Sequence, residues 1–145
     1  MLAHSGIKVN VTAVFTLDQV QRAAAALAGA PSVISVLAGR IADTGCDPVP
    51  IMRAAVEVVS SHTNMEVIWA SPRELLNVFQ ANDVGCHIIT VPDNILAKLQ
   101  TVGKDLQDYS LDTVKMFHND AARSGYQLRR RGSACLAITT KPSAS

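Results

Sequence analysis

The sequence predicts an α/β protein of four successive strand–helix units, with parallel strands and one further helix at the end. The chain has 145 residues, of which 48% are hydrophobic and 17% charged, and this suits one domain with a packed core. Segments with the two-residue apolar repeat of a strand alternate along the chain with segments that have the apolar repeat of a helix. Short connections with capping residues or glycines separate them. Such alternation favours a parallel sheet of right-handed strand–helix–strand units.

The first unit begins with residues 7–15, where β-branched residues are frequent and apolar positions alternate with a period of two. Thr16 follows, and Gln19 stands three positions later, which is the capping-box pattern of a helix start. Apolar residues then recur at helical spacing until Gly29, where we expect the run to end.

The second unit begins with residues 33–37, a short apolar run typical of a buried strand. Residues 39–45 contain two glycines and are predicted to form a loop. Asp47 and Pro48 suit the N-cap and the first position of a second helix. The apolar stripe of that helix comprises Ile51, Ala54, Ala55, Val58 and Val59.

The third unit begins with a predicted strand over residues 65–70. Ser71 is a candidate N-cap, Pro72 suits the first helical position, and Glu74 completes a capping box. The predicted buried stripe of the following helix comprises Leu75, Leu76 and Phe79.

The fourth unit combines a strand over residues 87–91 with a helix over residues 94–99. A loop from Gly103 leads to a last amphipathic helix that begins near Ser110 and ends at Gly125. Its predicted apolar face comprises Leu111, Val114, Phe117 and Ala121. We assign residues 1–128 to one domain and expect residues 129–145, which show no clear periodicity, to form a flexible tail.

Composition excludes several classes of function. The formal net charge is +1 and aromatic residues make up 4% of the chain, which argues against a nucleic-acid partner. The longest apolar runs fall well short of the roughly 18 residues that span a bilayer, so we expect no membrane partner. No basic segment followed by an apolar one opens the chain, and we expect a cytoplasmic protein.

Cysteine and histidine spacing indicates neither a disulfide framework nor a metal site. The three cysteines, Cys46, Cys86 and Cys135, include no C-x-x-C pair, and the four histidines show no H-x-x-x-H spacing. Gly39 and Gly45 match neither the G-x-G-x-x-G nor the P-loop spacing of nucleotide-binding folds. We therefore expect reduced thiols, no metal and no cofactor.

The candidate functional site lies where the predicted strands end, because α/β proteins bind ligands beyond the carboxyl ends of their strands. Arg40 follows the second strand, and Ser71 and Arg73 follow the third. Guanidinium groups and helix N-termini both bind anions, so together they favour a phosphorylated metabolite. The alternative is that both arginines are solvated loop residues and that Ser71 only caps a helix.

Five segments, in this order, resemble the transaldolase family and in particular its short, fructose-6-phosphate-aldolase-like branch. They are residues 6–15, 38–41, 69–73, 85–92 and 110–117. The resemblance implies a TIM barrel, of which this chain would supply the second half as four consecutive βα units and a C-terminal helix. It also implies Schiff-base chemistry in carbohydrate (pentose phosphate) metabolism, in which a dihydroxyacetone unit of a ketose phosphate is transferred or released.

The resemblance also implies which residues bind a phosphorylated sugar. Near the sugar they are Asn10, Thr12 and Ser35. At the phosphate they are Arg40, Ser71 and Arg73. Leu37 departs from the family pattern. In the family, an aromatic residue near the substrate occupies this position.

The catalytic lysine and the acidic residues of the family belong to earlier strands, which have no counterpart in this sequence. We therefore assign no catalytic residue and expect the isolated chain to be inactive. Lys8 is the only lysine on a predicted strand and shares a face with Asn10 and Thr12. It lies at the amino end of that strand, however, on the side associated with stability and not with chemistry.

Four strands of a barrel leave two open sheet edges and an uncovered inner face. We therefore expect a homo-oligomer, a complementing half-barrel or marginal stability. Three further readings stay open: a non-catalytic sugar-phosphate-binding remnant, a truncated gene product, and an unrelated doubly wound domain of flavodoxin type.

Overall fold

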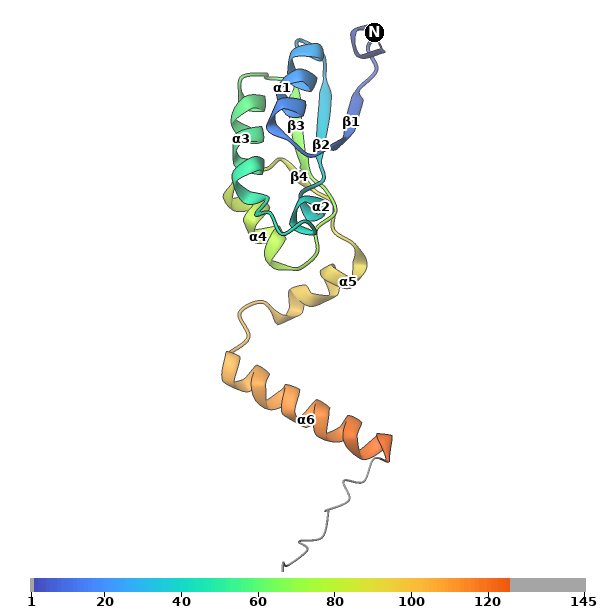
Figure 1. Cartoon of the computed structure of the whole chain (residues 1–145), viewed down its shortest axis with the longest axis vertical. Helices are drawn as coiled ribbons and strands as arrows, with labels where there is room; N and C mark the ends of the chain where they lie inside the picture. Colours follow the sequence, from blue (N-terminus) through green and yellow to red (C-terminus); the bar gives the residue numbers. More distant parts are fainter. Residues whose placement is uncertain (1, 126–145) are drawn as a thin grey trace, which may run out of the picture. The chain divides into compact units, whose positions relative to one another are not determined.

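A computed structural model describes residues 2–125 of the chain (Figure 1). Four strands form one parallel sheet in chain order, namely β1 (Val9–Val14), β2 (Ser32–Val36), β3 (Met65–Trp69) and β4 (Ile88–Ile89). The helices between them are α1 (Leu17–Ala26), α2 (Ala38–Ala42), α3 (Val49–Ser60) and α4 (Leu76–Asp83). The remaining elements are the 3-10 helices η1 (Leu2–Ser5) and η2 (Ala97–Thr101) and the helices α5 (Asp93–Leu96) and α6 (Leu106–Ser124).

The chain divides into two compact units, one of residues 1–102 and one that begins at Gly103. The first unit contains the sheet and α1 to α5, and the second contains α6. The predicted fold class is confirmed, because a four-stranded parallel sheet with alternating helices is the arrangement of half a (βα)8 barrel. The predicted domain limit at residue 128 stays a prediction, and the tail expected over residues 129–145 lies outside the described residues.

The core lies on the face of the sheet that α1 and α3 cover (Figure 1). Ile34, Val67 and Trp69 are completely buried there. Because successive side chains alternate across a strand, their neighbours Ser35 and Ile68 point to the opposite, inner face.

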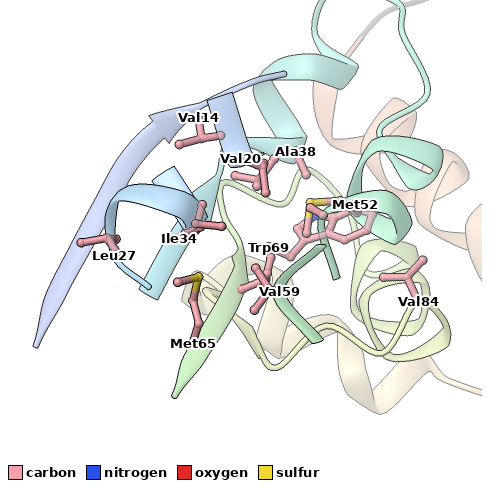
Figure 2. Close-up of a cluster of buried hydrophobic side chains, with 14 of the residues drawn as sticks. Val14, Val20, Leu27, Ile34, Ala38, Met52, Val59, Met65, Trp69 and Val84 are labelled. Carbon is pink, nitrogen blue, oxygen red and sulfur yellow. The ribbon is translucent and has the colours of Figure 1, made fainter. Parts of the chain in front are cut away.

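The largest core residue is Trp69, at the carboxyl end of β3. Figure 2 shows it in one cluster with Met52 and Val59, both from α3. This cluster fixes the end of β3, and with it the turn that follows the strand.

Two of the predicted helix starts are capped by the expected side chains. The N–H of Gln19 donates to Thr16 Oγ1 at 3.3 Å, and the N–H of Thr16 donates to Gln19 Oε1 at 3.1 Å, so the capping box of α1 is confirmed. Asp47 Oδ1 accepts from the N–H of Val49 at 2.9 Å, and α3 begins at that residue, one position later than predicted.

The loop predicted over residues 39–45 is wrong in its first part, where α2 forms a short helix. The carbonyl of Leu37 accepts from the N–H groups of Arg40 and Ile41, at 2.9 and 3.0 Å, and thereby starts the helical turn. Gly39 does not break the helix, because the N–H of Gly39 donates to the carbonyl of Ala70 on the neighbouring segment at 3.3 Å.

The predicted capping box over residues 71–74 is also wrong. Ser71 has a left-handed backbone with φ of 58°, whereas an N-cap residue is extended, and α4 begins only at Leu76. Asn77 Oδ1 accepts from the N–H groups of Arg73 and Glu74, at 2.8 and 3.1 Å. The side chain of Asn77 therefore takes the place of the Ser71 hydroxyl as acceptor for the N–H of Glu74, and it also accepts from Arg73.

The later start of α4 changes which of its residues face the core. Leu76 and Phe79, predicted to be buried, are 54% and 42% exposed. Asn77 and Ala81 are buried in their place. The predicted stripe of this helix is therefore wrong at Leu76 and Phe79.

The last predicted elements differ from the structure in their bounds. β4 is shorter than residues 87–91, and at its amino end His87 Nδ1 accepts from the N–H of Val67 at 3.2 Å. α6 begins four residues earlier than predicted, since Asp105 Oδ1 accepts from the N–H groups at the helix start. It ends, as predicted, at Gly125 in left-handed conformation.

The predicted apolar face of α6 is not buried within the part of the chain that the structure describes. Leu111, Val114 and Phe117 are 57%, 59% and 62% exposed. Over residues 2–125, no helix combines the length and the apolar character that crossing a membrane requires.

Gly39→Ala is expected to lower the free energy of unfolding by about 3 kcal/mol, the upper range for overpacking. A Cβ atom at this position would lie 1.5 Å from the carbonyl oxygen of Ser71, so the backbone must move. The measurement is the urea unfolding midpoint.

Gly45→Ala is the matched control for this change. Gly45 has φ of 83° but no atom within 4 Å of an added Cβ, so its substitution should cost only about 1–2 kcal/mol of backbone strain. Equal losses for the two variants would contradict the proposed close contact.

Candidate phosphate-binding site

The candidate site is built on a close approach between α2 and the turn after β3. An added Cβ at Gly39 would lie 1.5 Å from the Ser71 carbonyl oxygen and 3.4 Å from Arg73 Cγ. The position therefore requires glycine, because only a residue without a side chain allows the two backbones to touch. The contact brings Arg40, the next residue of α2, to the same region as Ser71 and Arg73.

The turn itself is strained at Ser71. Its φ of 58° is unusual for a residue with a side chain, and its neighbours Ala70 and Pro72 are both buried. The N–H of Ala70 donates to the carbonyl of Val36 at 2.9 Å, which ties the turn to β2. Backbone strain of this kind is common in binding sites, and here it coincides with the close approach of Ser71 to Gly39.

Arg73 is held in a fixed orientation by Asp43, the residue that follows α2. Its Nε and Nη2 atoms donate to the two carboxylate oxygens of Asp43 at 3.0 and 2.5 Å, a bidentate arrangement. The hydrogen bonds to Asp43 hold the pKa of Arg73 above its ordinary value. Both side chains are about half exposed, so the ion pair orients the guanidinium more than it stabilises the fold.

A hollow of about 430 Å³ opens beside this turn. Its lining residues come from the carboxyl ends of β3 and β4, and they are Ser71, Pro72, Arg73, Thr90, Val91 and Pro92. The N–H of Thr90 donates to the carbonyl of Trp69 at 3.2 Å, which holds the two sides of the hollow together. The hollow thus lies at the end of the sheet where α/β proteins bind ligands.

The structure brings only some of the predicted site residues together. Ser71 and Arg73 line the same hollow, and Arg40 is exposed on the adjoining α2. On the inner face, the Ser35 hydroxyl donates to Asn10 Oδ1 at 2.8 Å, so these two also form a pair.

Thr12 lies apart from both groups, because it lines a second hollow between β1 and α1.

The residues that sequence reasoning missed are Asp43, Asn77 and Thr90. Asp43 stands three positions after Arg40, which is a weak signal for a carboxylate near a cationic site. The sequence offers no comparable signal for Asn77, which supports the turn from inside α4.

No lysine among residues 2–125 lines the hollow beside Ser71. Lys8 Nζ lies 2.7 Å from Glu66 Oε2, and the hydrogen bond from Lys8 lowers the pKa of Glu66. Lys104 Nζ lies 2.7 Å from Asp112 Oδ2, within the second unit. Both amines are thus held in ion pairs with carboxylates and lie outside the hollow.

Fold and site together define a barrel-type α/β protein with arginine and serine side chains beyond the carboxyl ends of its strands. The family profile described as Transaldolase/Fructose-6-phosphate aldolase matches residues 1–134. The chain belongs to this family, and the resemblance drawn from five segments of the sequence is confirmed.

The chain is similar to several proteins described as probable transaldolases. It is 40% identical to that of Desulforudis audaxviator over 124 residues, which cover 85% of this chain and 54% of the relative. It is 36% identical to that of Thermoanaerobacter sp. over 116 residues, or 79% and 51% of the two chains. The chain therefore spans about half the length of the curated relatives it matches.

Asn77→Ala is expected to lower the free energy of unfolding by about 1–3 kcal/mol, because two N–H groups lose their acceptor. Gln80→Ala is the control, since it removes the acceptor of Asn77 Nδ2 and leaves Oδ1 for the two N–H groups. Urea unfolding of the three proteins is the measurement. An Asn77→Ala variant as stable as Gln80→Ala would contradict the supporting role of Asn77 Oδ1.

Proposed function

We propose that the chain binds the phosphate group of a sugar phosphate through Arg40, Ser71 and Arg73. The observation that carries this proposal is the hollow beyond β3 and β4, which Ser71 and Arg73 line while Arg40 adjoins them on α2. Guanidinium groups match phosphate oxygens in geometry and charge. Membership of the family supports a sugar phosphate as the source of that anion.

The two arginines have different parts in this proposal. Arg73 has five N–H donors, of which the bidentate bond to Asp43 occupies two, so three remain for a ligand. The carboxylate also offsets part of the charge of Arg73. Arg40 forms no ion pair within the described part of the chain and supplies the larger share of net positive charge.

We place the sugar of the ligand toward the inner face of the sheet. Asn10 is exposed there, and its amide nitrogen is a donor for a sugar hydroxyl while Oδ1 accepts from Ser35. Thr12 is the third residue that we assign to the sugar, and this assignment rests on the family resemblance, because Thr12 lines the hollow beside α1.

Schiff-base transfer or cleavage of a dihydroxyacetone unit requires a lysine amine close to the bound ketose. We propose that this chain does not supply that amine alone, and that turnover requires residues of a second chain. The reaction would belong to carbohydrate metabolism of the pentose phosphate type, in the cytoplasm. The ion pair of Lys8 with Glu66 favours a second candidate function, namely binding of the sugar phosphate without turnover.

Arg40→Gln and Arg73→Gln are each expected to weaken binding of fructose 6-phosphate by about tenfold or more, because each removes a charge-assisted contact. Isothermal titration calorimetry measures the effect. Arg53→Gln removes an equal charge from the exposed surface of α3 and should leave binding unchanged.

Fructose without its phosphate should bind more weakly to the parent chain than fructose 6-phosphate does. If the Arg53 variant lost as much affinity as the other two, binding would be a general effect of charge. The hollow beside Ser71 would then not be the phosphate site.

Sodium borohydride trapping tests the chemistry separately from the binding. Fructose 6-phosphate, reductant and the chain are combined, and the intact mass is measured on a sample whose circular dichroism shows a folded protein. We expect no covalent adduct, because the lysines of the described chain lie outside the hollow. A stable adduct, located by peptide mapping, would show that a lysine of this chain forms the imine.

A further inference from the structure

We propose that the free edge of β1, with the groove beside α1, binds the β4 edge of a second copy of the chain. Two four-stranded sheets would then close into one eight-stranded barrel. The choice of this partner rests on the barrel architecture that the proposed function implies. It does not rest on the phosphate site.

The first observation is the open edge of β1. β1 pairs only with β2 among the described strands, and its other side has no neighbour. Asn10, Thr12 and Ala13 are exposed on it, whereas every residue of β2 is buried. An edge strand presents unpaired N–H and C=O groups, and these pair readily with another strand.

The second observation is an apolar groove that runs along this edge. A hollow of about 930 Å³ lies between β1 and α1. Its apolar side chains are those of Val11, Val14, Ala23, Ala25, Ala26 and Leu27. The small alanine side chains leave room for a helical segment to approach α1 closely, as the next helix does in a closed βα sheet.

The third observation is that the opposite edge of the sheet carries a strand and exposed apolar side chains that suit the groove. β4 ends the sheet, and α5 and η2 follow it directly within the same compact unit. Leu96, Leu99 and Val102 in this segment are 45%, 44% and 49% exposed. Ile88, on β4 itself, is 37% exposed. This edge therefore offers a strand followed by an apolar helical segment.

The two edges are complementary in direction as well as in chemistry. All four strands are parallel, so a two-fold rotation about the barrel axis places β4 of one copy beside β1 of the other. The same rotation forms the second contact at once, which gives a closed symmetric dimer. A second copy thus fits both edges, whereas an unrelated strand would cover only one of them.

Ala26→Glu tests this surface. Ala26 is exposed in the single chain and lines the groove, so a glutamate there leaves the fold intact but places a charge in the interface. Gln21→Glu is the matched control: it adds the same charge to α1 at an exposed residue outside the groove lining. Sedimentation velocity over a wide range of micromolar concentrations measures the assembly state of each.

We expect the parent chain and Gln21→Glu to be dimers, and Ala26→Glu to dissociate with a dissociation constant raised by about tenfold or more. Arg40→Gln should remain dimeric, so failure of the phosphate site and failure of the interface give different results. A folded parent chain that stays monomeric would overturn the proposal and assign the groove to another occupant. A dimer that Ala26→Glu leaves intact would overturn it equally.

Discussion

Two backbone segments, α2 and the turn after β3, touch at Gly39 and Ser71 with no side chain between them. The other features of the site follow from this contact. Ser71 adopts its left-handed conformation, the start of α4 moves to Leu76, and Asn77 must satisfy the N–H groups that the turn leaves without helical partners. α2 then ends close enough to the turn for Asp43 to reach Arg73. One missing Cβ atom thereby positions the cationic side chains that a phosphate would contact.

Charged groups are arranged differently at the two ends of the sheet. At the carboxyl end, Asp43 orients Arg73 while three of its donors stay available, and Arg40 adds further positive charge. At the amino end, Lys8 is paired with Glu66, and the hydrogen bond from Lys8 lowers the pKa of that carboxyl. Two arginine side chains thus lie toward the carboxyl end, where parallel βα proteins bind their ligands.

Local sequence patterns predict those features that depend only on residues close together in the sequence. The capping box of Thr16 and Gln19 forms as expected, because nothing outside the first unit constrains the backbone there. The same pattern at Ser71 and Glu74 fails, since the contact with Gly39 removes Ser71 from the extended conformation that a cap requires. The positions of Arg40, Ser71 and Arg73 beyond the carboxyl ends of β2 and β3 could be predicted, because each follows a strand. Asp43 and Thr90 could not, because their distance from Arg73 depends on how α2 and β4 pack.

The residues proposed for the phosphate and those proposed for the sugar belong to different strands of the sheet. Arg40, Ser71 and Arg73 follow β2 and β3, which are internal strands with neighbours on both sides. The rest of the hollow is lined by Thr90, Val91 and Pro92, which follow β4 at the other edge of the sheet. Asn10 stands on β1, an edge strand that has no neighbour on its outer side among the described strands. Asn10 points to the inner face of the sheet, and only further strands would close that face into a barrel. In the proposed function, binding of the phosphate therefore relies on residues that follow β2, β3 and β4, whereas recognition of the sugar relies on Asn10 at the β1 edge of the sheet.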